Sequence, residues 1–250
     1  MSLKTLSIII PCYNEENRLK TTWDKISAYA DKIEADVTYV FVNDWSQDQT
    51  LRILQSIAEN TDLKVDVISY EHNRWKWYAV KQGVFAKDTD YYLIMDADGA
   101  TKLSEINTFL EYKEEAEILI GSRISHLAWR KWYKRLLGAV AHTIITKTLW
   151  LKNIRDTQCG FKMFSHEVKY LWNEMRIERR GFDFEFLYLA KQNKIKVLEI
   201  EVDWFDVWGS KIELLDYIKT LWELYRAYII HKWKMIRNSL KGKKKKASQR

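Results

Sequence analysis

The chain has 250 residues, of which 47% are apolar and 14% are aromatic, so it is long and apolar enough to bury a core and is not expected to be disordered. Its net charge of +7 predicts an anionic partner, although charge alone does not choose among a nucleic acid, a phospholipid surface and a phosphorylated substrate. Its two cysteines, Cys12 and Cys159, exclude a disulfide framework and a zinc cluster, and we expect both to pack as small apolar side chains.

The first half of the sequence alternates short β-branched runs with amphipathic patterns, which is typical of βαβ units around a mostly parallel sheet. The expected strands are Leu6–Ile10, Val37–Val42, Val65–Ser69, Tyr91–Met95 and Ile118–Ile120. The expected helices are Glu15–Lys32, Gln49–Asn60, Trp77–Ala86 and Ser104–Tyr112, with Asp48 and Ser104 as N-caps. These patterns predict a doubly wound α/β fold, in which ligands bind beyond the carboxyl ends of the strands.

The second half of the sequence has a different character. The segment His126–Leu151 places tryptophan and leucine beside arginine and lysine, which is typical of an amphipathic helix that lies in a membrane interface. A further amphipathic helix is expected from about Ile212 to Ile236, with Leu221 or Trp222, and Tyr225, on its apolar stripe. The lysine-rich tail Lys241–Arg250 is expected to be disordered.

No apolar run reaches the roughly 18 to 20 residues that a membrane-spanning helix needs. The nearest run, Leu136–Leu151, is interrupted by His142 and Lys147. The apolar run at the N-terminus meets polar residues too early for a secretory signal and predicts the first strand instead. We therefore expect a peripheral membrane protein, and its low cysteine content favours the cytosolic face.

Polar residues follow three of the predicted strands. Asp96 and Asp98 come directly after the strand that ends at Met95, Asn43 and Asp44 follow the second strand, and Pro11–Glu15 follows the first. Two carboxylates at a strand end can bind Mg²⁺ or Mn²⁺, which in turn binds a diphosphate. A solvated acidic turn would have the same sequence, but three polar loops at neighbouring strand ends favour a single site.

Seven segments carry a resemblance to a known family: Ile10–Glu16, Val42–Thr50, Met95–Thr101, Gly121–Arg123, Arg155–Lys162, Gly181–Glu185 and Trp204–Lys211. In this order they resemble the glycosyltransferase family 2 enzymes with a GT-A fold, and within that family the dolichyl-phosphate sugar synthases. The forms Asp-Ala-Asp-Gly-Ala-Thr and Asp-Thr-Gln-Cys-Gly-Phe-Lys are more similar to the glucose branch than to the mannose branch. The resemblance implies a Rossmann-like nucleotide-diphospho-sugar transferase fold with interfacial amphipathic helices.

The resemblance also implies how the chain is divided. A nucleotide-sugar-binding half would span residues 1–125, and an acceptor-binding half with the interfacial helix would span residues 126–211. A C-terminal amphipathic helix over residues 212–240 and a basic disordered tail over residues 241–250 would follow.

Residue roles follow from the same matches. The residues that would hold the nucleotide are Pro11, Tyr13, Glu15, Asn43, Asp44 and Asp96. Asp96 and Asp98 would hold the divalent metal, Mg²⁺ or Mn²⁺, on the donor diphosphate. The catalytic residues would be Asp98, Arg123 and Lys211, with Arg123 and Lys211 facing phosphates.

The implied reaction is the inverting transfer of a hexose from a nucleotide-sugar, with UDP-glucose favoured and GDP-mannose possible, to dolichyl or polyprenyl phosphate at an anionic membrane surface. A phosphate monoester is largely dianionic at neutral pH, so it can attack without a protein base. The alternative is a GT-A protein that only binds a nucleotide or a lipid phosphate. Nucleic-acid binding is not expected, because the basic residues cluster on apolar helices rather than around an aromatic stacking platform.

Four tryptophans depart from the family pattern. Trp45, Trp75 and Trp77 stand where the family has glycine, and Trp208 stands where it often has proline. Glycine in such loops permits positive φ and close approach of the backbone to a ligand, both of which tryptophan obstructs. Two interpretations remain open: the loops tolerate tryptophan on an exposed face, or the side chains weaken donor binding.

Overall fold

The computed structural model describes residues 4–123, 154–179, 181–205, 222–223 and 225–232. Its centre is a seven-stranded sheet in the order β3-β2-β1-β4-β6-β5-β7. Strand β6 is antiparallel to its neighbours β4 and β5, whereas the other neighbouring strands are parallel. The strands are β1 (Thr5–Cys12), β2 (Asp36–Asn43), β3 (Val65–Ser69), β4 (Tyr91–Ile94), β5 (Ile118–Ser122), β6 (Lys162–Ser165) and β7 (Val197–Glu201).

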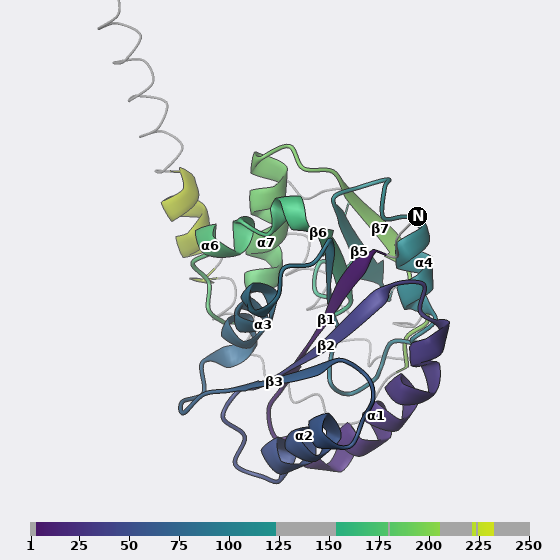
Figure 1. Ribbon diagram of the computed structural model, residues 1–250. Helices are drawn as coiled ribbons and strands as arrows, with labels where there is room; N and C mark the ends of the chain where they lie inside the picture. The colour runs from purple at the N-terminus through teal and green to yellow at the C-terminus, as the bar shows by residue number, and fades with distance from the viewer. Residues whose placement is uncertain (1–3, 124–153, 180, 206–221, 224, 233–250) are drawn as a thin grey trace, which may run out of the picture.

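Helices cover both faces of the sheet (Figure 1). One face packs against α1 (Glu16–Tyr29), α2 (Thr50–Glu59) and α4 (Glu105–Glu111). The other packs against α3 (Trp75–Ala86), α6 (Leu171–Glu174) and α7 (Phe182–Gln192). Short 3-10 helices occupy Ala30–Lys32 and His166–Val168.

The central strand β1 contributes to both cores. Ile8 and Ile10 belong to one apolar cluster, whereas Ile9 between them belongs to the other, and all three side chains are fully buried. Successive side chains of a strand point to opposite faces, so a strand covered on both sides needs an unbroken apolar run. The sequence Ile8-Ile9-Ile10 meets this need and lets β1 lie inside the sheet, between β2 and β4.

The predicted doubly wound α/β fold is confirmed, and each of the five predicted strands overlaps a strand of the structure. Strands β6 and β7 and helices α6 and α7 were not predicted as elements. Strand β6 has only four residues and begins with a buried lysine, Lys162, which hides its apolar pattern. Both cysteines are buried, as expected.

The predicted N-cap of α2, Asp48, lies one residue before the observed N-cap position, Gln49, whose own side chain makes no capping hydrogen bond. The Asp48 carboxylate instead accepts hydrogen bonds from the backbone N–H groups of Thr50, at 2.9 Å, and Glu16, at 3.2 Å. It therefore links the starts of α2 and α1. Ser104 does precede α4 at the N-cap position, but its hydroxyl makes no capping hydrogen bond.

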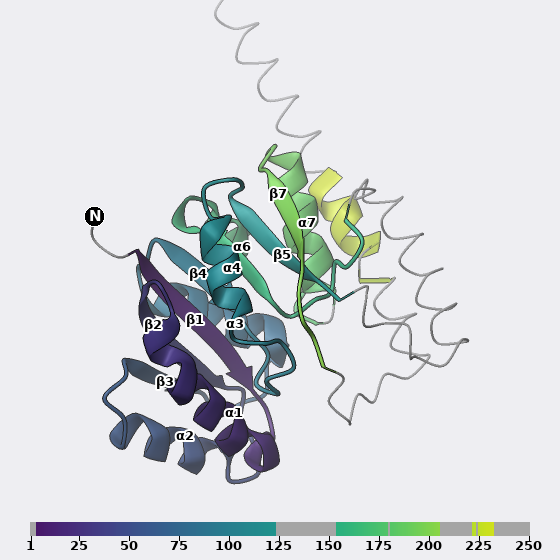
Figure 2. The same cartoon turned by 90° about the vertical axis from the view of Figure 1, so that its right-hand side faces the viewer.

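Residues 225–232 are helical and lie beside α7 (Figure 2). Ala227 and His231 are buried there, and His231 Nε2 lies 2.6 Å from the buried carboxylate of Glu185. Trp222 and Tyr225, two residues of the predicted apolar stripe, are 61% and 52% exposed. The predicted interfacial helix 126–151, the boundary at residue 125, Lys211 and the tail lie outside the described residues.

Gly83 allows α3 to pack closely on the sheet. A Cβ atom at this position would lie 2.4 Å from Ile9 Cγ2 and 3.3 Å from Val42 Cγ2. Both neighbours are fully buried, so neither has free space to move into. The approach of α3 to β1 and β2 therefore depends on the absence of a side chain at residue 83.

We expect Gly83→Ala to lower the free energy of unfolding by about 1 to 3 kcal/mol, as overpacking does, although alanine is favoured over glycine in helices by about 1 kcal/mol. Urea unfolding measures the change. Gln82→Ala on the same helix is the control and should have little effect. A Gly83→Ala variant as stable as the parent would show that the helix has room to shift.

Candidate active site

The loops after β1, β2 and β4 meet at one edge of the sheet, because β1 lies between β2 and β4 and runs parallel to both. A pocket of about 520 Å³ lies between these loops. The strand order reverses here, and doubly wound sheets bind ligands at such a switch point. Six of the predicted site residues line the pocket: Pro11, Tyr13, Glu15, Asp44, Asp96 and Asp98. The other lining residues are Cys12, Asn73, Trp75, Lys76, Ala79 and Ala97.

Asp96 follows β4 and is held between a cation and a glycine. Lys76 Nζ donates a hydrogen bond to Asp96 Oδ1, and the two charges form an ion pair whose side chains remain 39% and 40% exposed. A Cβ atom at Gly160 would lie 2.0 Å from Asp96 Oδ2, so only glycine leaves space for the carboxylate. Withdrawal from water by itself would raise the pKa of Asp96, but the Lys76 ammonium outweighs it and the pKa is lowered.

Asp98 lies two residues further along the same loop. Its Oδ1 accepts a hydrogen bond from the backbone N–H of Ala100 at 3.0 Å, which fixes the carboxylate beside the turn at Gly99. Burial, and after it the negative charge of Asp96, raises the pKa of Asp98. The site therefore holds two carboxylates that repel each other. Lys76 pairs directly with Asp96, and the charges of Arg123 and Lys162 also lower its pKa.

This donor set fits a divalent metal. Mg²⁺ and similar hard cations take one or two carboxylates and complete their coordination with phosphate oxygens and water. Within the described part of the chain, no group of three or more histidine, cysteine, aspartate or glutamate side chains could hold a metal ion by itself. Asp96 and Asp98 would therefore share a metal with an anionic ligand in the pocket rather than enclose it.

Asp44 is the most heavily hydrogen-bonded side chain of the pocket. Its carboxylate accepts hydrogen bonds from the hydroxyl of Tyr70, at 2.9 Å, the backbone N–H of Arg74, at 2.7 Å, and Nδ2 of Asn73, at 3.1 Å. Burial raises the pKa of Asp44, and these donors partly offset the rise. The network joins the loop after β2 to the start of α3 and fixes one wall of the pocket.

The loop after β1 is tied to the loop after β2 through Asn14 and Glu15. The backbone N–H of Asn14 donates to Ser46 Oγ at 3.0 Å, and its side chain accepts from the backbone N–H of Gln47 at 2.8 Å. The Glu15 carboxylate forms a bidentate pair with Arg18, although burial still raises its pKa. Tyr13 on this loop is 48% exposed, so its ring is free to meet a ligand.

Two predicted site residues within the described part of the chain, Asn43 and Arg123, do not line the pocket. Asn43 is buried beneath it, where Nδ2 donates to Ser69 Oγ at 2.9 Å and Oδ1 accepts from the backbone N–H of Ser46 at 3.3 Å. Arg123 makes a bidentate ion pair with the buried Asp156, with nitrogen to oxygen distances of 2.7 and 2.9 Å. Its positive charge still contributes to the lowered pKa of Asp96. Lys211 lies outside the described residues.

The tryptophans that replace glycine differ in their surroundings. Trp45 and Trp75 have φ angles of +58° and +68°, which is the left-handed conformation that glycine adopts at least cost. Both side chains are exposed, and Trp75 lines the pocket. The guanidinium carbon of Arg179 lies 4.5 Å from the centre of the Trp75 ring. Trp77, in contrast, is 7% exposed and belongs to the apolar core rather than to the pocket. Neither interpretation left open by the sequence holds for Trp77, because its side chain is neither exposed nor part of the pocket.

The sequence analysis missed Lys76 and Asn73, which lie in the same segment as Trp75 and Trp77. The Lys76 side chain reaches Asp96, and the Asn73 side chain reaches Asp44. A second missed feature is the buried ion pair between Lys162 and Asp183, at 2.7 Å. The sequence could have indicated this pair, because a lysine within an apolar strand needs a buried anionic partner.

We expect Trp45→Gly to be more stable than Trp45→Ala by about 1 kcal/mol, because only glycine avoids the cost of a positive φ. Both variants lose the ring contact between Trp45 and His72, so the difference between them isolates the backbone term. Thermal unfolding of the two variants in parallel measures it. An alanine variant as stable as the glycine variant would mean that the backbone at residue 45 relaxes.

Comparison with known proteins agrees with this geometry. The family model for glycosyl transferase family 2 matches residues 7–171. The chain belongs to glycosyltransferase family 2. Curated relatives named dolichyl-phosphate beta-glucosyltransferase include a human protein, 36% identical over 228 residues, which cover 84% of this chain and 70% of the relative. The protein of that name from Dictyostelium discoideum is 32% identical over 252 residues, which cover 92% of this chain and 76% of the relative.

Solved structures share the fold. Glucosyl-3-phosphoglycerate synthase from Mycobacterium tuberculosis, crystallised with Mn²⁺ and UDP-glucose, superposes with a TM-score of 0.64 at 15% identity, covering 88% of this chain and 79% of that one. Mannosyl-3-phosphoglycerate synthase from Rubrobacter xylanophilus gives a TM-score of 0.65 at 13% identity, with 90% and 73% of the two chains covered. The predicted family and the predicted transferase fold are thus confirmed.

Proposed function

We propose that this family 2 enzyme transfers glucose from UDP-glucose to the phosphate of dolichyl phosphate, with inversion at the anomeric carbon, at a membrane surface. The observation that carries the proposal is the carboxylate pair Asp96 and Asp98, with Lys76 beside it, on the same pocket as the fixed carboxylate of Asp44. The names of the curated relatives support the donor sugar and the acceptor.

The two ends of the pocket suit the two ends of a nucleotide-sugar. Asp44 and the exposed Tyr13 offer an acceptor and an aromatic ring for the nucleoside. Asp96 and Asp98 would hold Mg²⁺ or Mn²⁺, which supplies charge neutralisation for the donor diphosphate when it is bound. Lys76 Nζ, already at this edge, can meet the same diphosphate.

The transfer step needs little from the protein beyond position and charge. An oxygen of the acceptor phosphate forms a bond to C1 of glucose, while the bond from C1 to the diphosphate oxygen breaks and its electron pair leaves with UDP. No proton has to move, because the acceptor is largely dianionic at neutral pH. The chain's own part is to orient the two substrates and to stabilise the charge that develops on UDP.

A membrane-surface location on the cytosolic face is part of the proposal. Within the described residues, no helix has both the length and the apolar character to cross a bilayer. The support for surface binding is the basic and aromatic sequence of residues 126–151, which suits the headgroup region of an anionic membrane.

The test is transfer of labelled glucose from UDP-glucose to dolichyl phosphate in detergent, with Mn²⁺ and with EDTA. We expect metal-dependent transfer, and a much lower rate with GDP-mannose. Asp98→Asn should lower the rate at least about a hundredfold, since it removes a carboxylate that would hold the metal against the donor diphosphate. The fold should survive, because an asparagine oxygen can still accept the hydrogen bond from Ala100.

Asp24→Asn is the matched control, because Asp24 is an exposed residue of α1 away from the pocket. It should leave transfer unchanged. Full activity of Asp98→Asn would remove the carboxylate pair from the reaction, and a wild-type protein that transfers neither sugar would contradict the proposed activity.

Trp75 favours a second candidate, a protein that binds a nucleotide or a lipid phosphate without catalysis. Its ring lines the donor pocket and is packed against the guanidinium of Arg179. If the ring takes space that the donor needs, the bound donor lies out of line for transfer. Transfer by the wild-type protein would exclude this candidate.

We expect Trp75→Gly to bind UDP several-fold more tightly than the wild-type protein in the presence of Mn²⁺. Trp75→Ala should gain less, because it removes the ring but keeps a side chain at positive φ. Titration calorimetry measures both. Equal or weaker UDP binding by the glycine variant would show that the ring stands clear of the nucleotide.

A further inference from the structure

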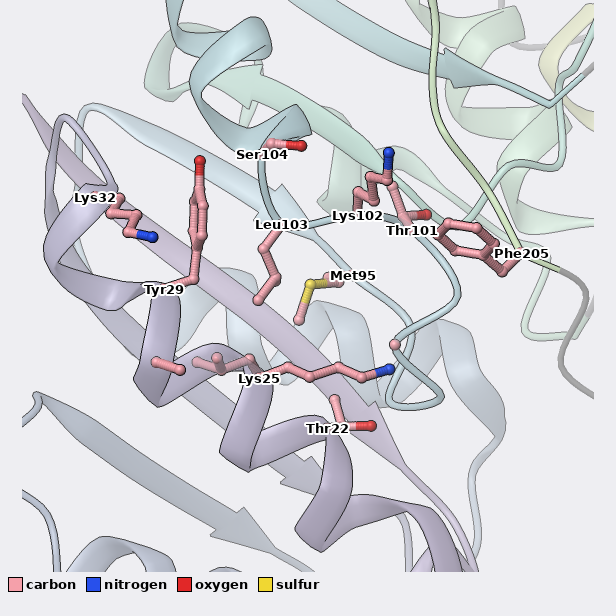
Figure 3. A pocket seen from close by; sticks show the side chains of 13 residues that line it. Thr22, Lys25, Tyr29, Lys32, Met95, Thr101, Lys102, Leu103, Ser104 and Phe205 are labelled. Carbon is pink, nitrogen blue, oxygen red and sulfur yellow. The ribbon is translucent and has the colours of Figure 1, made fainter.

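One side of the loop that carries Asp96 faces open space. A pocket of about 520 Å³ lies there, between α1 and residues 99–104, and Thr22 and Met95 are among its lining residues (Figure 3). Thr22 Oγ1 donates a hydrogen bond to the backbone carbonyl of Ala97 at 2.9 Å. Close packing does not hold the whole loop from this side, so the position of Asp96 depends on what lies on its other side.

The segment that leads into β6 supports Asp96 from that other side. Ile94 in β4 pairs with Lys162 in the antiparallel strand β6, so continuing this register past the end of β4 places Gly160 opposite Asp96. Gly160 has no side chain, and a Cβ atom there would lie 2.0 Å from Asp96 Oδ2. The Asp96 carboxylate thus lies directly against the backbone of residue 160.

Lys162 holds this stretch of backbone in place. Its side chain is 1% exposed, and its Nζ donates one hydrogen bond to the backbone carbonyl of Cys159 and another to Asp183 Oδ1, the second at 2.7 Å. Cys159 directly precedes Gly160, and Asp183 lies in the first turn of α7. Lys162 therefore ties the segment beneath Asp96 to helix α7.

The buried pair of Lys162 and Asp183 also acts on the charges of the donor site. Burial by itself would raise the pKa of Asp96, and the charge of Lys162 is one of those that lower it instead. Burial would lower the pKa of Lys76, but the charges of Asp96 and then Asp183 raise it. A buried ion pair is weak evidence for a contribution to stability, because removing two charges from water offsets their attraction. Its position points to a role in the site.

We propose that Lys162 is a positioning residue for the metal end of the donor site, because it holds the backbone against which the Asp96 carboxylate lies. The inference rests on the proposed function, in which Asp96 binds a divalent metal. Lys162 acts through that backbone rather than on the donor, since it is buried and is not among the residues that line the pocket. Without it the Asp96 carboxylate loses the fixed place that a metal with a preferred coordination geometry needs.

Titration calorimetry of UDP, once with Mn²⁺ and once with EDTA, tests the proposal. The variant to compare with the wild-type protein is Lys162→Met/Asp183→Asn, which removes both charges with side chains of similar size and leaves no buried charge alone. We expect unchanged UDP binding in EDTA. With Mn²⁺ we expect binding about tenfold to a hundredfold weaker, the usual loss when a group that orients a metal ligand is removed. A fold that had been damaged would weaken UDP binding in both conditions.

Asp183→Asn alone separates the two partners. Lys162 keeps its hydrogen bond to the Cys159 carbonyl in this variant and can donate to the asparagine oxygen, so most of the Mn²⁺ effect on UDP binding should remain. A loss as large as that of the double variant would assign the effect to Asp183 and overturn the role of Lys162.

Glu185→Gln/His231→Gln is the matched control, because it alters a second buried pair that involves α7, with 2.6 Å between the two side chains, away from the pocket lining. It should bind UDP like the wild-type protein in both conditions. An equal loss in this control, or a full Mn²⁺ effect in Lys162→Met/Asp183→Asn, would overturn this inference alone. Wild-type UDP binding that is indifferent to Mn²⁺ would overturn the proposed function and this inference with it.

Discussion

Two carboxylates stand two residues apart at the end of β4, and their mutual repulsion is the constraint around which the site is built. The charge of Asp96 contributes to the raised pKa of Asp98, while Lys76 holds the pKa of Asp96 down. Burial and the charge of Asp96 outweigh the positive charges of Arg18 and Lys76 near Asp98, so this carboxylate remains poorly compensated. A divalent metal that arrives on a nucleoside diphosphate would complete the balance of charge.

The fold serves this charge arrangement through three features. The parallel strands β1, β2 and β4 bring three polar loops to one edge, and hydrogen bonds between Asn14, Ser46 and Gln47 hold two of these loops together. Gly160, on the segment that leads into β6, leaves the space in which the Asp96 carboxylate sits. The second half of the chain thus shapes the donor site, even though the described residues that line it come from the first half.

Local pattern was enough to predict the strands and helices around the first three polar loops. The hydrophobic pattern predicts these strands because β1 and β4 are buried on both faces and appear in the sequence as unbroken apolar runs. It failed for β6, where Lys162 interrupts the pattern and is buried only by virtue of its ion pair with Asp183, a residue 21 positions away. The same limit applies to Lys76 and Asn43, because only the folded chain shows that one reaches Asp96 and the other lies beneath the pocket.

The tryptophans at residues 45 and 75 show where backbone geometry overrides side-chain preference, since both keep a positive φ that tryptophan disfavours. Asn43 Oδ1 accepts a hydrogen bond from the backbone N–H of Ser46, while Asn73 Nδ2 and the backbone N–H of Arg74 donate to Asp44. These bonds hold the backbone of the two loops whatever side chain it carries. The conformation expected for glycine therefore persists without glycine, at a cost in stability.

The central claim is that the metal lies between Asp96, Asp98 and the donor diphosphate. Electron–nuclear double resonance of Mn²⁺ bound to the protein with UDP tests it most directly, because the phosphorus nuclei of UDP show a strong contact coupling to Mn²⁺ only when their oxygens are its ligands. The account predicts phosphorus coupling in the wild-type protein and its loss in Asp98→Asn under the same concentrations. Bound Mn²⁺ without phosphorus coupling, or unchanged coupling in the variant, would contradict it.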